Sequence, residues 1–405
     1  MNKTLWAGLY LIIAIGFSGY NYFSQIVYES KFSRAPEPNS ILKEGGNAPF
    51  FHSAFVSGNL TKEVHSATAV SLSNGELLLF WYGGEREGSA DVAIYSRRLN
   101  TETAQWGNVR KIVERQQVAG SLQRNIRKLG NPIAYEYGQN EIWLFFVSVS
   151  VGGWAGSSIN LQKSFDNGET WGKPQRLITS PFLNISTLVK ERPIRYQDGS
   201  IGLPVYHEFL GKFAELLHLD QRGQVVNKYR MSKAREAIQP VVIPRSESQA
   251  IALMRNVNDS SDHRLWYSQS ADSGKSWQPL EPLQVPNPNA AVTAIPLDNS
   301  DLLLMVFNNH PSERIDLTLA LSMDAGKNWN LLTEFEKEPE SDEHNPFSYP
   351  FLVTTNNEQF HLFYTWKRKK IKYVVFNQQQ LLSWIKNKNL GTKILEVKHG
   401  TISDT

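Results

Sequence analysis

Six short segments of the sequence place a polar or aromatic side chain immediately before an apolar, strand-like run. These side chains are His65, Asn131, Arg192, Gln239, Asn289 and Tyr349. Imidazole, amide, guanidinium and phenol groups can hold the hydroxyls and the carboxylate of a sugar, and imidazole and phenol can also move a proton. If the six strands begin at one place in the fold, these side chains form a shared polar site.

Further residues of the same chemistry lie outside these six segments. Trp154 stands in a glycine-rich loop, where an exposed indole could stack on a sugar. His207 and Glu208 follow an apolar strand and could transfer a proton together, or could be two ordinary exposed residues. Arg368 adds a cation at the end of another strand. Because the whole set is rich in cations and amides, we expect it to bind an anionic sugar.

The composition excludes several other kinds of site. The 405 residues contain no cysteine, which rules out disulfides, thiolate catalysis and cysteine-bound zinc. The nine histidines show no metal-binding spacing, and no phosphate- or dinucleotide-binding glycine motif is found, so neither a metal nor a cofactor is expected. The 42 Lys+Arg nearly balance the 39 Asp+Glu, which argues against a nucleic-acid partner.

A repeated octet identifies the elements that must position these residues. It occurs as Ser164–Trp171, Ser270–Trp277 and Ser322–Trp329, with a degenerate copy at Asp220–Gly223. In each octet we expect the Asp to accept hydrogen bonds within a turn, the Gly to adopt a positive φ and the Trp to pack between sheets. A period of about 50 residues made of short strands predicts the blades of a β-propeller.

The octet resembles the Asp box of sialidases, also called the bacterial neuraminidase repeat. Residues 48–377 therefore resemble the all-β, six-bladed propeller of that family, although Asp boxes also occur in other glycosidases, lyases and non-enzymatic propellers. The six blades are expected near residues 58–106, 107–171, 172–226, 227–279, 280–331 and 332–377. The sixth is one strand short, and Pro49–Val56 could supply that strand and close the ring. Because inner strands of a propeller start at one mouth, the six polar segments should converge.

The resemblance implies a carboxylate-binding site. Sialidases hold the substrate carboxylate with three arginines, whose planar forks match it bidentately. Arg255 and Arg314 resemble the second and third of these arginines. His65 stands where the first is expected, and it could bind a carboxylate, act as acid or base, or simply pack.

The resemblance also implies a nucleophile. Tyr349 resembles the family's catalytic tyrosine, and a phenol needs a base to become a good nucleophile. Gln239 occupies the position expected for the activating glutamate and cannot take a proton. Glu236, Glu191 and Glu208 are the other candidates for the base.

The general acid is expected in the segment Gly83–Asp91. Asp91 is the nearest match to the family's acid, and Glu87 is the substitute. A carboxyl group at such a mouth could have its pKa raised for acid work. Arg86 could pair with this acid or bind substrate.

The chain ends are predicted to lie outside the propeller. Residues 1–23 include an uncharged stretch, Leu5–Phe23, that approaches the roughly 20 residues of a membrane span and also fits a cleaved signal or a buried helix. Residues 24–47 are predicted to be a linker, and the tail 378–405 to begin with a short helix over Gln379–Lys386. The propeller is therefore expected outside the cytoplasm, in the periplasm or extracellular space, either tethered to the membrane or secreted.

Three functions remain open at this point. The first is an exo-glycosidase that acts on an acidic glycan containing a sialic-acid-like or uronic-acid sugar. The second is a lyase on uronic-acid polysaccharides, in which a His or Tyr removes the C5 proton while an Arg or Gln neutralises the carboxylate. The third is a propeller that binds glycans or serves as a scaffold without catalysis.

Overall fold

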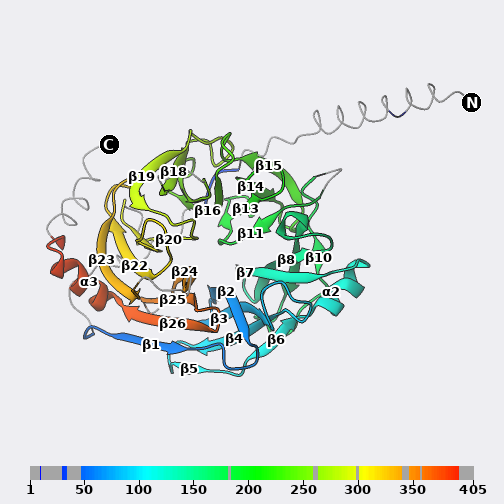
Figure 1. Ribbon diagram of the computed structural model, residues 1–405, viewed down its shortest axis with the longest axis horizontal. Helices are drawn as coiled ribbons and strands as arrows, with labels where there is room; N and C mark the ends of the chain where they lie inside the picture. The colour runs from blue at the N-terminus through cyan, green and yellow to red at the C-terminus, as the bar shows by residue number, and fades with distance from the viewer. Residues whose placement is uncertain are drawn as a thin grey trace, which may run out of the picture.

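The computed structural model describes residues 10, 30–33, 47–180, 184–258, 263–297, 301–339, 346–355 and 358–391. Six antiparallel sheets are arranged in a ring, which confirms the predicted all-β, six-bladed propeller (Figure 1). The expected anchor or signal lies outside the described residues, except for Tyr10. Within the described residues, no helix has the length and apolar character of a membrane span.

Each blade is an antiparallel sheet in which most strands pair with their neighbours in the sequence. The first contains β2 (Glu63–Ser71), β3 (Glu76–Gly84), β4 (Ala93–Asn100) and β5 (Gln105–Trp106), with β6 (Arg110–Val113) also on β4; the second contains β7 (Lys128–Gly138), β8 (Glu141–Val149), β9 (Ser157–Ser164) and β10 (Gln175–Arg176). In the third, β11 (Leu188–Val189) and β12 (Ile194–Arg195) both pair with β13 (Ile201–His207), followed by β14 (Phe213–Leu219) and β15 (Val225–Arg230).

The other three blades have four strands each. The fourth contains β16 (Ala237–Pro244), β17 (Ala250–Asn256), β18 (Arg264–Ser270) and β19 (Glu281–Pro286), and the fifth contains β20 (Thr293–Pro296), β21 (Leu303–Phe307), β22 (Asp316–Ser322) and β23 (Asn330–Lys337). The sixth contains β24 (Phe347–Thr354), β25 (Gln359–Trp366), β26 (Lys370–Asn377) and, as its outer strand, β1 (Phe51–Phe55). The pairing of β1 with β26 confirms the predicted closure of the ring by the start of the propeller.

The strands are apolar on both faces because each blade is packed between two others. In β8, Ile142, Leu144 and Phe146 pack in one cluster with Leu78 and Phe80 of the first blade. Trp143, Phe145 and Val147, which alternate with them, belong to a cluster that includes Leu217 and Leu219 of the third blade. The two-residue period of a strand therefore serves two interfaces.

The octets are turns that seal neighbouring blades together. The carboxylates of Asp166, Asp272 and Asp324 each accept the N–H four residues later, at 2.8–2.9 Å. Gly168 has φ +83°, and a Cβ there would lie 2.7 Å from Leu78 of the preceding blade. The glycine is thus required both by the backbone conformation and by the close approach of the two blades.

Three short segments lie outside the strand pattern. Helix α3 (Gln378–Asn387) confirms the predicted C-terminal helix and packs on β26 and β23. Helix α2 (Arg115–Leu122) was not expected; only one of its residues, Val118, is buried. Phe32, within the expected linker, is fully buried and stacks on Tyr196 of the third blade, so this part of the chain is fixed to the propeller.

A buried lysine joins three blades near the axis. The Lys190 ammonium group donates to Glu191 Oε1 at 2.5 Å and to the carbonyls of Val292 and Pro350, both at 2.9 Å. Lys190 and Glu191 are only 1–2% exposed. The ion pair therefore ties the innermost strands of the third, fifth and sixth blades together.

We predict that Lys190→Met strongly destabilises the fold. Among the described residues, the substitution leaves the buried Glu191 carboxylate with Arg192, at 3.8 Å, as its remaining cation. Removing one partner of a buried ion pair costs roughly 3–5 kcal/mol. Urea unfolding followed by tryptophan fluorescence would measure this loss. The double variant Lys190→Met/Glu191→Gln should recover part of it, and the exposed Lys111→Met is the control; equal stability of wild type and Lys190→Met would contradict the prediction.

Candidate active site

The polar segments share one backbone conformation. At the start of five blades, one residue adopts a left-handed conformation with φ between 38° and 55°. These residues are Ser66, Asn131, Gln239, Asn289 and Tyr349. In β2, β7, β16 and β24 the pairing register shifts at this point. Such a bulge redirects a side chain out of the regular alternation of a strand. The sequence segments expected at one mouth therefore share a common geometry.

A hydrogen-bond network centred on the amide of Gln239 connects four blades. Its Nε2 donates to the hydroxyl of Tyr349 at 3.0 Å and to that of Tyr206 at 3.2 Å. Its Oε1 accepts from Arg255 at 3.2 Å, and Asn131 donates to the same Tyr206 hydroxyl at 3.2 Å. Gln239 is buried, so this network fixes its side chain. Tyr349 and Gln239, which the family resemblance paired, are in direct contact.

Tyr349 is packed against His65 rather than against a carboxylate. The two ring centroids are 4.3 Å apart, and His65 Nδ1 lies 2.9 Å from the Thr365 hydroxyl. Burial lowers the pKa of His65 to about 3, and the charges of Arg368, Arg314 and Arg255 add to the effect. His65 is therefore a neutral imidazole at physiological pH and a weak base.

Three arginines gather around this tyrosine. Arg255 Nε donates to the Asn289 side chain at 2.7 Å, and Arg314 donates to the Asn289 carbonyl. Burial lowers the pKa of Arg314 to about 10, and repulsion from Arg255 and Arg368 contributes. Because like charges repel, this arrangement favours a negatively charged ligand.

The third of these arginines comes from an unexpected blade. Arg368 follows β25 in the sixth blade and forms an ion pair with Glu87 of the first blade. Its charge acts on His65, which stands where the family's first arginine was expected. The sequence indicates Arg368 only as one of several cations. Spacing along the chain does not show that the end of β25 in the sixth blade lies next to the β3–β4 loop of the first blade.

The three acidic candidates have different surroundings. Asp91 is exposed and accepts from the Glu85 N–H at 2.8 Å and from Ser89, which holds its pKa below the usual range. Burial alone would raise the pKa of Glu87, but the charge and hydrogen bond of Arg368 bring it below the ordinary value. Burial raises the pKa of Glu208, against the opposing charges of Arg255 and Lys212. Glu208 is therefore the carboxyl group of these three that most readily keeps a proton.

Four predicted residues are placed away from the Tyr349 side chain. Arg192 donates to the Leu352 carbonyl and lines a cavity with Pro244 and Pro296, at the far ends of the inner strands. His207 lies 3.0 Å from Glu215 and stacks on Phe213, so it does not form a pair with Glu208.

Trp154 and Arg86 belong to the border between the first two blades. Trp154 is half-buried, with its ring against Gly130 and under the Lys128 ammonium group at 3.9 Å, so it is not a free stacking surface. Arg86 lines a separate cavity with Lys128. Within the described residues, no three His, Asp or Glu side chains are grouped as metal ligands.

We predict that His65 stays neutral throughout the physiological range. Its pKa is about 3 in the folded chain and 6.5 in the unfolded chain, so the unfolded state binds a proton first as the pH falls. Folding stability should consequently decrease from about pH 6.5 toward pH 3, and His65→Gln should remove that part of the decrease. Histidine NMR titration, assigned with His65→Gln, would measure this, and a titration near pH 6.5 would contradict it.

The comparisons with known proteins agree with the fold. The family model "BNR repeat-like domain" matches residues 75–362. A Hadza microbial sialidase, Hz136, is similar in structure, with a TM-score of 0.63 and 17% sequence identity. The match covers 78% of this chain and 66% of the sialidase chain, which is slightly under two thirds of the sialidase's length. The intramolecular trans-sialidase of Ruminococcus gnavus gives 0.62 at 13% identity, covering 81% and 97% of the two chains.

A protein of unknown function from Dyadobacter fermentans is about as similar, with a TM-score of 0.62 at 12% identity over 80% of this chain and 97% of its own. No curated protein matches the sequence. At such identities the likeness establishes the fold alone, whereas the family model covers most of the propeller. The chain belongs to the family of proteins with a BNR repeat-like domain, and its fold is similar to that of these sialidase structures.

Proposed function

We propose that this protein is a glycoside hydrolase that acts on an acidic glycan. The substrate would bind at the mouth of the propeller formed by Tyr349, Gln239 and their neighbours, called the mouth below. The observation that carries the proposal is the convergence of Arg255, Arg314 and Arg368 beside the Tyr349 phenol. Guanidinium groups bind carboxylates through charge-assisted hydrogen bonds. A sugar whose carboxylate lies among them would present its anomeric carbon to a tyrosine.

The arginines would hold the substrate in place. Arg255 and Arg314 are both fixed by Asn289, so their positions are set before a ligand arrives. Arg368 would take the part of the family's missing first arginine, with Glu87 as its partner in the free protein. Such preorganisation lowers the entropy lost on binding.

Tyr349 would stabilise the positive charge that develops at the anomeric carbon. Among the described residues, no carboxylate touches its hydroxyl, which instead accepts from Gln239. An uncharged phenol oxygen can stabilise an oxocarbenium-like centre, whereas full covalent attack requires that a base remove its proton.

Glu208 would donate a proton to the departing oxygen. Its raised pKa favours the protonated form more than that of Glu87 or Asp91. General acid catalysis by a carboxyl group is helped by a pKa that is raised toward the working pH. Asp91, the first sequence-based candidate, caps its own loop.

A lyase on uronic-acid glycans is the second candidate, and Gln239 favours it. A glutamine and arginines can neutralise a uronate carboxylate without taking a proton. The C5 proton would pass to Tyr349 as a phenolate or to the neutral His65 imidazole, whose ring packs against it. The two reactions differ in their product, because elimination leaves an unsaturated sugar and hydrolysis does not.

We further propose that the site works outside the cytoplasm, on a propeller tethered or exported by the N-terminal segment. The support is the uncharged run Leu5–Phe23 at the start of the chain. An acidic glycan of the cell envelope or the surroundings would be the matching substrate.

We predict that the full chain releases sugar from an α-sialoside or a uronate glycoside and that Tyr349→Phe lowers kcat by about 100-fold or more. Arg314→Ala should weaken substrate binding by about tenfold or more, because it removes a charge-assisted contact. The assay would follow a fluorogenic glycoside together with the ultraviolet absorbance of unsaturated uronates.

Tyr137→Phe and Arg195→Ala are the matched controls, because both lie on the far side of the second and third blades. Unsaturated products lost in Tyr349→Phe would support the lyase instead. Glycan binding that depends on Arg314, with no product from either chemistry, would leave a non-catalytic propeller.

A further inference from the structure

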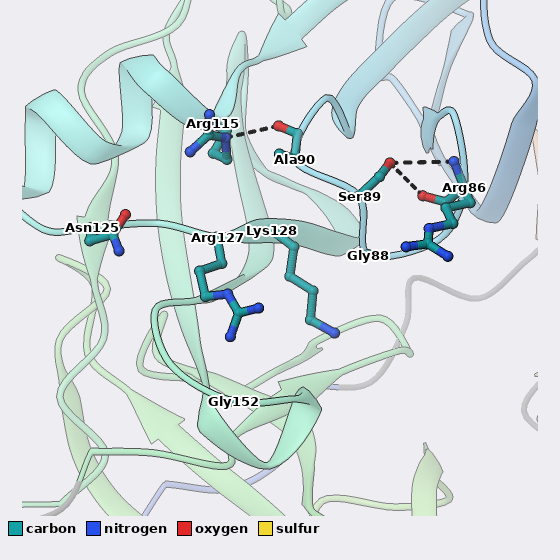
Figure 2. A pocket seen from close by; sticks show the side chains of 9 residues that line it. All are labelled: Arg86, Gly88, Ser89, Ala90, Arg115, Asn125, Arg127, Lys128 and Gly152. Atoms are coloured by element: carbon teal, nitrogen blue, oxygen red, sulfur yellow. Dashed lines mark hydrogen bonds between the residues drawn. The ribbon is translucent and has the colours of Figure 1, made fainter.

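A second cavity lies beside the mouth, between the first and second blades (Figure 2). It has a volume of about 450 Å³ and is lined by Arg86, Gly88, Ser89, Ala90, Arg115, Asn125, Arg127, Lys128 and Gly152. The loop between β3 and β4 forms one wall, and helix α2 with the start of β7 forms the other. Arg127 and Lys128 extend side by side toward the loop that carries Gly152 (Figure 2).

The cavity is strongly basic. Four of its nine lining residues are cations and none is a carboxylate. Within the part of the chain that the structure describes, none of these four forms an ion pair. Arg115 is held in place by the carbonyls of Ala90 and Ile126, at 2.8 and 3.0 Å. The chain as a whole has a net charge of only +3, so this concentration of unpaired charge is local.

The nearest acids of this loop are already engaged. Asp91 accepts from Ser89 and from the Glu85 N–H, and Glu87 is paired with Arg368 at the mouth. Among the residues that the structure describes, no acidic side chain pairs with the guanidinium group of Arg86 or with that of Arg127. An anion entering the cavity would therefore find donors that no carboxylate of the described chain satisfies.

The cavity and the mouth share a wall. Trp154 contacts both sides of this wall. Its ring lies 3.9 Å from the Lys128 ammonium group and also packs against Gly130. Gly130 directly precedes Asn131, a residue of the mouth. A Cβ on Gly88, which follows Glu87, would lie 3.3 Å from the Lys128 side chain. Burial lowers the pKa of Lys128, and the charges of Glu87 and Glu208 oppose this. Lys128 is thus within electrostatic reach of both mouth carboxylates.

We propose that this cavity is a second anion subsite, which binds a carboxylate or sulfate on the sugar adjacent to the one held at Tyr349. The inference rests on the proposed function, since it assumes that the first acidic sugar occupies the mouth. It narrows the substrate to glycans with acidic groups on consecutive sugars, as opposed to neutral glycans capped by a single acidic sugar.

Three disaccharides that share a terminal uronate would test the subsite. Their second sugar is neutral, carboxylated or sulfated, and their affinity for the full chain would be measured by titration calorimetry. The wild type should bind an acidic second sugar about tenfold more tightly than the neutral one, because each charge-assisted contact is worth about that factor. A gain for one acid only would identify the carboxylate or the sulfate as the natural group.

The variant Arg86→Ala/Arg127→Ala should abolish this gain and leave the affinity for the neutral disaccharide unchanged. Both side chains are exposed, so we expect the variant to fold. Arg195→Ala/Arg222→Ala removes two exposed arginines elsewhere and should keep the gain. Equal affinity of the wild type for all three disaccharides, no measurable binding of any, or a gain that persists in Arg86→Ala/Arg127→Ala would overturn the subsite.

Arg314→Ala separates this inference from the proposed function. If Arg314→Ala weakens all three ligands alike, the mouth binds the shared uronate as proposed. If it leaves them unchanged while Arg86→Ala/Arg127→Ala removes the gain, the proposed use of the mouth fails and the basic cavity remains an anion site.

Discussion

The arrangement of the site depends on one buried ammonium group. Lys190 reaches from the third blade to carbonyls of the fifth and sixth blades, and the Pro350 carbonyl that it binds belongs to the residue after Tyr349. Its charge is balanced by Glu191 in the same buried space. Backbone carbonyls so close to the axis have no strand partner there, so the lysine satisfies groups that would otherwise be buried without a hydrogen bond. The position of Tyr349 is therefore linked to the centre of the ring.

Two amide side chains hold the charged and phenolic groups of the mouth in place. Gln239 and Asn289 together hold Arg255, Arg314 and Tyr349 in one network. Amides orient charged side chains without neutralising them, so the positive potential at the mouth is preserved for a ligand. A glutamate at Gln239 would instead neutralise Arg255.

The fold was largely predictable because its signals are local and repeated. The octets at Asp166, Asp272 and Asp324 identify the turns, the glycines that the turns require and the spacing of the blades. Because the sixth blade lacked one strand, the segment that forms β1 was predicted to complete it. The repeat predicted that blade starts such as Tyr349 and Gln239 come together, and the family resemblance pointed to Arg255 and Arg314 beside them. The pairing of Arg368 with Glu87 joins residues 281 positions apart, and the preference for Glu208 over Asp91 depends on burial. Neither distance nor burial can be obtained from spacing along one chain.

The sequence did not indicate the buried role of Lys190, because a lysine before a glutamate is usually a pair of surface residues.

The left-handed residues at the mouth have an evolutionary consequence. A side chain at positive φ costs about 1 kcal/mol or more relative to glycine. Within the described residues, Ser66, Asn131, Gln239, Asn289 and Tyr349 carry this cost at the starts of the first, second, fourth, fifth and sixth blades. Each of them could be exchanged for glycine with relief of backbone strain, and only a demand for the side chain itself opposes that change. Backbone strain and the use of the side chain therefore compete at the same five positions. In a lineage that lost its substrate, the mouth would be expected to drift toward glycine long before the blades lost their form, leaving an intact propeller with an empty face.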